Sequence, residues 1–345
     1  MKINIAYLSS FLILFFTSCG SNHLDIDVTK VIIPEVEINR LDQDLFKINN
    51  NSNDTLSNGL NKSFIELQSK YGNFYNIFIN RIINHGAEHD SSNMIQINKF
   101  INDPDMHEAY NDCQKEYPNT TILNNQFTDL FKHYSYYFKT KKTPQIITMM
   151  SGFNYSVVLL DNTLAIGLEM YLGRDNKFYK MLAFPQYKTM FMNKENIIPD
   201  AAQAWMITEF PYKMDKTDFL SEITYMGKIM YLCDALLPNV PDTVKIKYTE
   251  QQLNYCLQNE FNIWSYFANQ KLIYTTNQSE IIKYTCEGPF TSAFSKDAPP
   301  RIGYWIGWQI IRQYMKNKPE LSLDELMKEA DAQKILREAK YKPRK

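Results

Sequence analysis

The fold is decided by the stretch TPQIITMMSGFNYSVVLLDNTLAIGLEMYLG, which covers residues 143–173. It carries three apolar runs, at 146–150, 155–160 and 164–172. Apolar runs of this length between turn residues indicate β-strands. The dipeptide Asp161-Asn162 separates the second run from the third and is typical of a tight turn between paired strands. This stretch therefore predicts a small β-sheet.

Helices are predicted on both sides of the sheet. Upstream, apolar residues recur at helical spacing, and we expect residues 35–143 to be entirely helical, with helices over Phe64–Ile83 (broken at Gly72), Asp105–Tyr117 and Leu123–Phe138. Residues 144–345 should hold the sheet and further helices. The predicted fold class is α+β, predominantly α, with a single domain over residues 35–345.

Two helices of the second half should form its core. One apolar stripe predicts a helix that ends before Pro238, because its members recur at spacings of four and three residues: Phe219, Ile223, Met226, Met230, Cys233 and Leu237. The segment Arg301–Met315 is apolar nearly all round, as a buried helix should be. Gly303 and Gly307 lie on one face of it, and their spacing allows another backbone to pack closely.

Composition excludes several classes of protein. The chain has 345 residues, of which 44% are hydrophobic, so a real core is expected and global disorder is excluded. Lys and Arg total 37 against 38 Asp and Glu, and this net charge of −1 provides no field that would attract nucleic acid. Only 11 glycines leave little material for phosphate-binding loops. We expect no nucleic-acid partner and no cofactor.

The first residues predict export and a lipid anchor. Lys2 precedes the apolar run Ile3–Phe16, which is too short for a permanent membrane span and fits a signal peptide over residues 1–18. The run ends in Phe16-Thr17-Ser18-Cys19, which resembles the cleavage box of bacterial lipoproteins. Cys19 would then carry the lipid, and residues 19–34 would form a tether. The alternative is a plain secretory signal with an incidental cysteine.

The remaining cysteines are Cys113, Cys233, Cys256 and Cys286. They show no Cys-x-x-Cys spacing and predict no catalytic cysteine, and buried free thiols are at least as compatible with the pattern as disulfides. The C-terminal stretch 334–345 is rich in Lys and Arg. It is best interpreted as a solvated tail, with attraction to anionic lipids or to a partner as the alternative.

One histidine pair suggests metal chemistry. His85-Gly86-Ala87-Glu88-His89 matches the H-x-x-E-H pattern of some zinc peptidases. The glycine and the polar residues that follow instead favour a helix end, where histidine is solvated. All five histidines lie in the first 133 residues, and the predicted sheet and everything after it have none. A zinc peptidase that uses His85, His89 and a distant carboxylate is therefore only the alternative interpretation.

Carboxylates are the remaining candidates for a site: Glu169, Glu195, Glu209, Asp215, Asp218, Glu222 and Glu260. Glu222 lies at the edge of the apolar stripe, about 60° from Phe219, and should be partly buried. We expect Arg301 to be its partner in a structural ion pair, with a ligand-binding role for Glu222, Arg301 and Glu209 as the alternative.

Five sequence blocks resemble the gliding-motility lipoprotein GldB family of Bacteroidota. Together with the cleavage box they span nearly the whole chain after residue 18, and they are Ser151–Val158, Ile166–Gly173, Phe219–Ile223 with Gly227-Lys228, Gly288–Thr291 and Pro300–Trp308. The resemblance implies an envelope lipoprotein needed for gliding and associated with type IX secretion. It also implies a fold like that of zinc peptidases, in which an edge strand leads to a helix carrying H-E-x-x-H.

The sequence departs from that peptidase pattern. The segment Glu195–Phe210, where the ligand helix should lie, contains no histidine, and Glu222 falls where a third ligand could lie. A lone carboxylate cannot hold catalytic zinc. We therefore expect a zincin-like architecture without metal ligands or catalytic residues, with a groove between residues 155–172 and 195–237 that binds a peptide or protein of the gliding or secretion machinery. The absence of acidic residues over Gly20–His23 favours the periplasmic side of the membrane.

Overall fold

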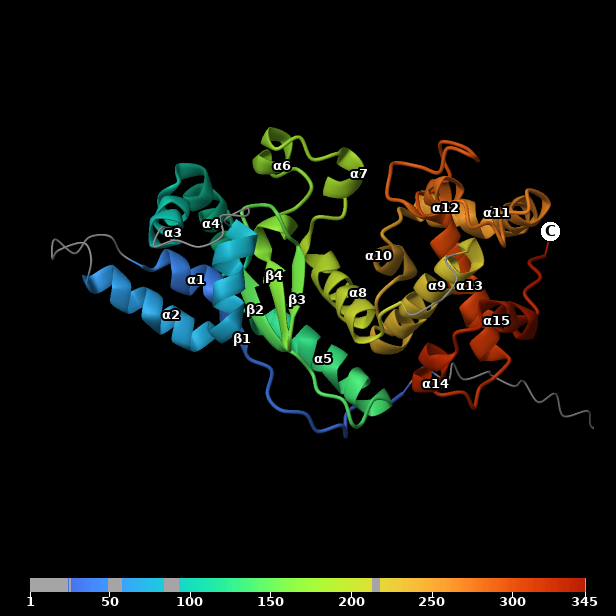
Figure 1. Ribbon diagram of the computed structural model, residues 1–345, viewed down its shortest axis with the longest axis horizontal. Coiled ribbons are helices and arrows are strands. Elements are labelled where there is room, and N and C mark those ends of the chain that lie inside the picture. The colour runs from blue at the N-terminus through green and yellow to red at the C-terminus, as the bar shows by residue number, and fades with distance from the viewer. Residues whose placement is uncertain (1–23, 25, 49–57, 84–92, 213–217, 345) are drawn as a thin grey trace, which may run out of the picture.

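The protein is built around a small mixed sheet, which Figure 1 shows at the centre of a mostly helical body. The computed structural model describes residues 24, 26–48, 58–83, 93–212 and 218–344. The sheet has the strand order β1-β2-β4-β3. Its strands are β1 (Ile38–Arg40), β2 (Gln145–Met149), β3 (Val157–Leu160) and β4 (Thr163–Gly167). The first three strands in that order run parallel, and β3 is antiparallel to β4.

The predicted α+β class, mainly α, is confirmed, and so is the hairpin at Asp161-Asn162, where Leu160 pairs with Thr163. Two details of the prediction are wrong. The third apolar run is a strand only to Gly167 and continues as the 3-10 helix η2 (Leu168–Tyr171). Residues 35–143 are not entirely helical, because they contain β1, which is too short to show strand periodicity.

Strand β1 is held in the sheet by a buried carboxylate. Asp42 has no exposed surface and accepts hydrogen bonds from the Arg40 guanidinium at 2.7 Å and from Thr148 Oγ1 at 2.5 Å. These bonds join β1 and the start of α1 to the middle of β2. A contact between residues 106 positions apart leaves no local signal in the sequence.

Helices cover both faces of the sheet, because side chains alternate along each strand. Ile147, Met149 and Ala165 face one hydrophobic cluster, and Ile146 and Leu164 face another. The first cluster includes α1 (Leu41–Phe46), α2 (Asn58–Ile77), the π-helix η1 (Phe78–Ile83) and α3 (Asn93–Asn102). The second includes α4 (Pro104–Glu116), α5 (Thr121–Tyr137) and α8 (Ile197–Glu209). The predicted break at Gly72 lies inside α2, where φ is +54°.

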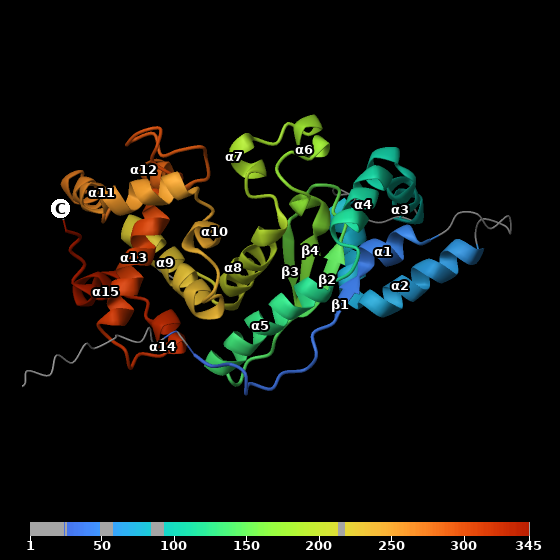
Figure 2. The same cartoon turned by 180° about the vertical axis from the view of Figure 1, so that it is seen from behind.

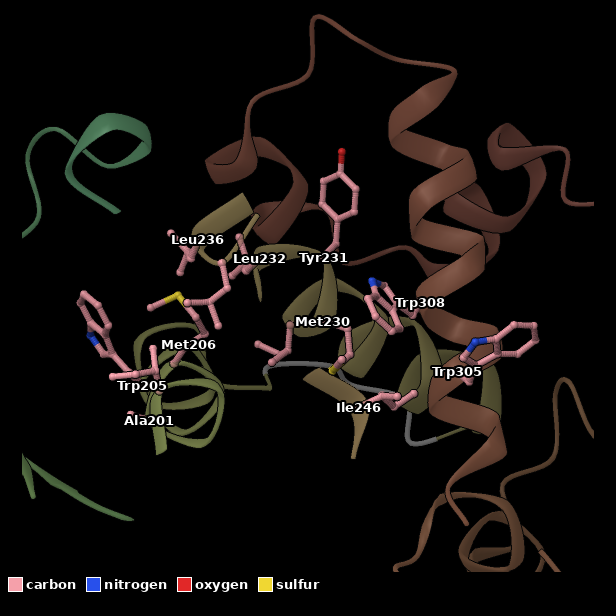
Figure 3. Packing of buried hydrophobic residues seen from close by; sticks show 14 of the residues in the cluster. Ala201, Trp205, Met206, Met230, Tyr231, Leu232, Leu236, Ile246, Trp305 and Trp308 are labelled. Atoms are coloured by element: carbon pink, nitrogen blue, oxygen red, sulfur yellow. The ribbon is translucent and has the colours of Figure 1, made fainter. Parts of the chain in front are cut away.

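Helices α9 (Phe219–Leu236) and α13 (Ile302–Lys316) form the centre of the C-terminal half. Asp218 caps α9 by accepting from Ser221 N at 2.8 Å. Figure 3 shows α9 side chains between those of α8 and α13, with Leu232 and Leu236 on the side of Met206 and with Met230 toward Trp308. Gly307 and Gly227 lie at the contact of α9 with α13, so the expected close backbone packing is confirmed.

Shorter elements complete the body. They are α6 (Lys177–Met181), α7 (Gln186–Thr189), η3 (Lys194–Asn196), α10 (Asp242–Ile246), α11 (Glu250–Asn269), α12 (Gln278–Thr285), α14 (Leu323–Lys328) and α15 (Ala332–Ala339). All four described cysteines are free, and Cys286 is the exposed one among them. Within the described ranges no helix combines the length and the apolar character needed to cross a membrane.

Candidate functional site

A cavity of about 270 Å³ lies beyond the carboxyl ends of β2 and β4. Its walls come from six parts of the chain: residues 153–156 after β2, 170–171 after β4, 184–192 around α7, Asp200 of α8, Lys247 after α10, and 287–301 before α13. In Figures 1 and 2, α7 and the loop between α12 and α13 lie side by side above α8 and α10. Ligands of α/β proteins commonly bind at this edge of a sheet, so the cavity is the candidate site.

The wall at residues 151–155 is shaped around a buried carboxylate. Glu169 Oε1 accepts hydrogen bonds from Ser151 N at 2.6 Å, from Phe153 N at 3.1 Å and from Ser151 Oγ. Gly152 and Phe153 both have positive φ, of +70° and +63°, and this turn points the N–H groups of Ser151 and Phe153 at one anion. Glu169 therefore fixes the turn that leads from β2 into the wall of the cavity.

Glu169 is itself unusual, because it has no exposed surface and its Oε2 has no hydrogen-bond partner in the described structure. Burial raises its pKa to about 7, although the bonds from Ser151 and Phe153 act in the opposite direction. At a pH near 7 the Glu169 carboxyl is therefore protonated in about half of the molecules. The carboxyl faces the protein interior, so we assign it a structural role.

A second group of polar residues connects η2, α8 and α10 at the cavity. Tyr171 Oη donates to Asp200 Oδ2 at 2.9 Å, and Lys247 Nζ lies 2.7 Å from the other oxygen of that carboxylate. The Tyr171 side chain is buried, and burial raises the pKa of its hydroxyl well above the usual value. Asp200 therefore ties the sheet to the C-terminal half and places one lysine at the cavity wall.

Arg301 completes the wall directly before α13. It has left-handed backbone geometry, with φ of +53°, and its Nη2 donates to the Ile246 carbonyl at 2.8 Å. Its Nε is buried and has no hydrogen-bond partner in the described structure. At the rim, Lys188 of α7 lies 3.5 Å from Glu287, so one exposed ion pair joins α7 to the loop after α12. Three basic and two acidic side chains line the cavity.

The edge strand β3 begins at this cavity. The Ser156 carbonyl accepts from Gly167 N at 2.9 Å, and Val158 pairs with Ala165 two residues further along. Antiparallel strands alternate between bonded and non-bonded pairs, so the N–H and C=O groups of Val157 and Leu159 point away from β4. No further strand lies beyond β3 in the sheet that the structure describes. These groups therefore have no partner strand in the described sheet, and α8 packs next to β3.

The predicted site residues do not come together. Arg301 lines the cavity, but the expected ion pair with Glu222 is wrong, because Glu222 accepts from Tyr304 Oη at 3.1 Å instead. Glu222 is half-buried, as expected. Glu209 pairs with Lys141 and lines another cavity, of about 390 Å³, together with the buried Lys228. Burial lowers the pKa of Lys228 to about 8.

Cys19, His85, His89 and Asp215 lie outside the described residues. In the described ranges no group of three or more His, Cys, Asp or Glu side chains is arranged to hold a metal ion.

Asp200, Lys247 and Tyr171 are not among the predicted site residues, and Glu169 is predicted only as one of several candidate carboxylates. A signal for Glu169 was present, since a lone carboxylate inside the apolar run Ile166–Leu172 needs buried partners. No comparable signal marks Lys247, which meets Asp200 from 47 residues away.

Together the fold and the cavity define a mostly helical α+β protein with an edge strand that begins at a cavity of mixed apolar and charged lining. The chain belongs to the family described as gliding motility protein GldB, whose family model matches residues 21–343. No curated protein and no solved structure matches it. Membership implies a role in gliding motility, and this lipoprotein family implies attachment to a membrane through a lipid.

Proposed function

We propose that this protein is a non-enzymatic component of the cell envelope that holds an extended segment of another gliding or type IX secretion protein. The segment pairs with β3, and a side chain at one end of it enters the cavity. The observation that carries the proposal is the outer edge of β3, where the backbone groups of Val157 and Leu159 lack a strand partner in the described sheet.

The composition of the neighbouring cavity supports a peptide occupant. Apolar side chains, including Phe153, Tyr187 and Phe191, line it together with the charged Lys188 and Arg301. A mixed wall of this kind suits the side chain of a polypeptide, which is amphipathic, better than a purely polar ligand. Tyr155 is 41% exposed directly before the strand and offers a further aromatic contact.

We also infer that the body is a peptidase-like scaffold without catalytic metal ligands, exported to the periplasmic side of the membrane. Helix α8 follows the β3–β4 hairpin and packs on the sheet through buried Ala201 and Trp205, as a ligand-bearing helix of a zinc peptidase would. Helix α8 contributes Asp200 to the cavity wall, and its sequence contains no histidine. A single carboxylate in an ion pair cannot replace the ligand set of catalytic zinc.

The test is a proline substitution at Val157, which removes only an N–H group that points away from β4. In Val157→Pro the bonds to β4 remain, because Val157 belongs to a non-bonded pair, whereas an added strand loses a hydrogen bond. Val157→Ala is the matched control, because it also loses the isopropyl group but keeps the N–H. A photo-crosslinking amino acid in place of Tyr155 reports the partner in living cells.

At equal abundance and thermal stability, Val157→Pro should stop gliding and lose the crosslink to an envelope protein, while Val157→Ala keeps both. Normal gliding and crosslinking in Val157→Pro cells would show that β3 does not receive a strand.

A further inference from the structure

Three segments of the chain enter the sheet at one edge. Residues 26–37 lead into β1, residues 138–144 lead into β2, and the turn at Asp161-Asn162 leads into β4. Because these three strands are parallel, their amino ends share an edge, here called the amino edge of the sheet. The cavity lies beyond the opposite edge, where β2 and β4 end.

The first described residues pack against the helical body. Leu24 is 4% exposed and belongs to the main hydrophobic cluster, and Val36 is buried in the same cluster. Between them, residues 29–36 run along α5 next to Asn124 and Lys132. Figures 1 and 2 both show this segment beginning beside α14 and passing under α5 to β1. The body therefore holds Leu24 and residues 26–37.

The remaining link to the lipid is short. Four residues lie between Cys19 and Leu24, and the five residue steps span at most about 18 Å when the chain is fully extended. A lipid on Cys19 must then hold the bilayer close to the side where Leu24 is packed. The two edges of the sheet are separated by the strand length, which is about 17 Å for the five residues of β2. The loops at both ends add to this distance.

We propose that the bilayer carrying the lipid anchor lies against the amino edge of the sheet, so that the cavity and its rim face away from the membrane. The occupant of the amino edge is thus a phospholipid surface. The exposed charges at the amino edge nearly balance, because Lys30, Lys139 and Lys142 are offset by Asp27, Glu35 and Glu37. Strong electrostatic attraction to the phospholipid surface is therefore not required. The length of the anchor, rather than charge, sets the orientation.

The orientation can be measured by energy transfer from single labelled cysteines to acceptor lipids. The lipidated protein is reconstituted into phosphatidylcholine vesicles that contain a headgroup-labelled acceptor lipid. Native Cys286, exposed beside the cavity rim, takes one donor dye, and Met181→Cys on α6 provides a second site at the carboxyl edge. Lys142→Cys and Asp161→Cys report the amino edge, and all three introduced cysteines are placed in a Cys286→Ser background. Circular dichroism and unfolding curves confirm that each variant is folded.

Transfer from positions 142 and 161 should be severalfold greater than transfer from positions 181 and 286. Equal transfer from both edges would mean that the protein tumbles on its anchor, and stronger transfer from position 286 would mean that the cavity faces the bilayer. Either result overturns the proposed orientation. Neither bears on strand addition at β3, which the Val157 variants test separately.

Discussion

Gly307 of α13 lies so close to Ile223 of α9 that a Cβ at Gly307 would be 1.8 Å from the Ile223 carbonyl oxygen. The approach is reciprocal, because a Cβ at Gly227 would be 2.3 Å from the Gly307 carbonyl oxygen. The two helices therefore meet backbone to backbone, with no space for a side chain at either position. The surrounding core, including Trp305 and Trp308, is arranged around this contact.

Gly307→Ala should destabilise the protein by about 3 kcal/mol or more, because the methyl group can only be accommodated if the two backbones move apart. Gly288→Ala is the matched control, since its Cβ would meet only the Phe290 carbonyl at 3.8 Å. Urea unfolding of both variants measures the difference. Similar midpoints for the two variants would contradict the close packing.

Glu169 should make stability depend on pH near neutrality. Its pKa is about 7 in the folded protein and 4.5 in the unfolded chain, so the folded state binds more protons between these values. The favourable contribution is complete below pH 4.5 and is lost as pH rises through 7. The difference of about 2.5 pH units corresponds to a loss on the order of 3 kcal/mol.

Replacement by glutamine separates this effect from other titrations. In Glu169→Gln the amide oxygen can still accept from Ser151 and Phe153, but nothing titrates at that position. The free energy of unfolding, measured between pH 5 and 8, should fall more steeply in the native protein than in this variant. Glu195→Gln, at an exposed position, should behave like the native protein. Parallel curves for native protein and Glu169→Gln would refute the assignment.

The local spacing of apolar residues was sufficient to predict the main helices and strands, but it did not predict the candidate site. The spacing of Phe219, Ile223 and Met230 predicted α9 because a helix that buries one face must repeat its apolar residues. The partner of Glu222 depends instead on how α9 and α13 are rotated against each other, which the glycine contact decides. The cavity joins residues from 153 to 301, and no local spacing encodes such an arrangement.

The ion network around Asp234 should be a major source of stability. Asp234 is buried and accepts from Lys245 at 3.1 Å, from Trp308 Nε1 at 2.8 Å and from Arg312 at 2.8 and 2.9 Å. Asp234→Ala removes this shared acceptor, while Arg312 keeps its bonds to Asp242, and should cost about 3–5 kcal/mol. Asp324→Ala removes an exposed carboxylate that pairs with Lys328 and should cost less than about 1 kcal/mol. Comparable losses in thermal stability would contradict the burial argument.

The zinc alternative has a direct test. If the body lacks catalytic metal ligands, the purified protein should contain no stoichiometric zinc by elemental analysis, and a chelator should leave its unfolding curve unchanged. His85→Ala combined with His89→Ala should then support normal gliding. One zinc per chain that disappears in the double variant would favour the peptidase interpretation over the proposed binding function.

The lipid on Cys19 should be essential for gliding, because in the proposed function attachment to the membrane keeps the protein near its partner and turns its cavity away from the bilayer. Cells that lack the gene should not glide on glass, and the native gene should restore movement. Cys19→Ala should not restore it, since this variant lacks the thiol that receives the lipid. Abundance by immunoblot must match between the two strains. Gliding of Cys19→Ala cells at the native speed would show that the anchor is dispensable, and gliding of cells without the gene would remove the role in motility itself.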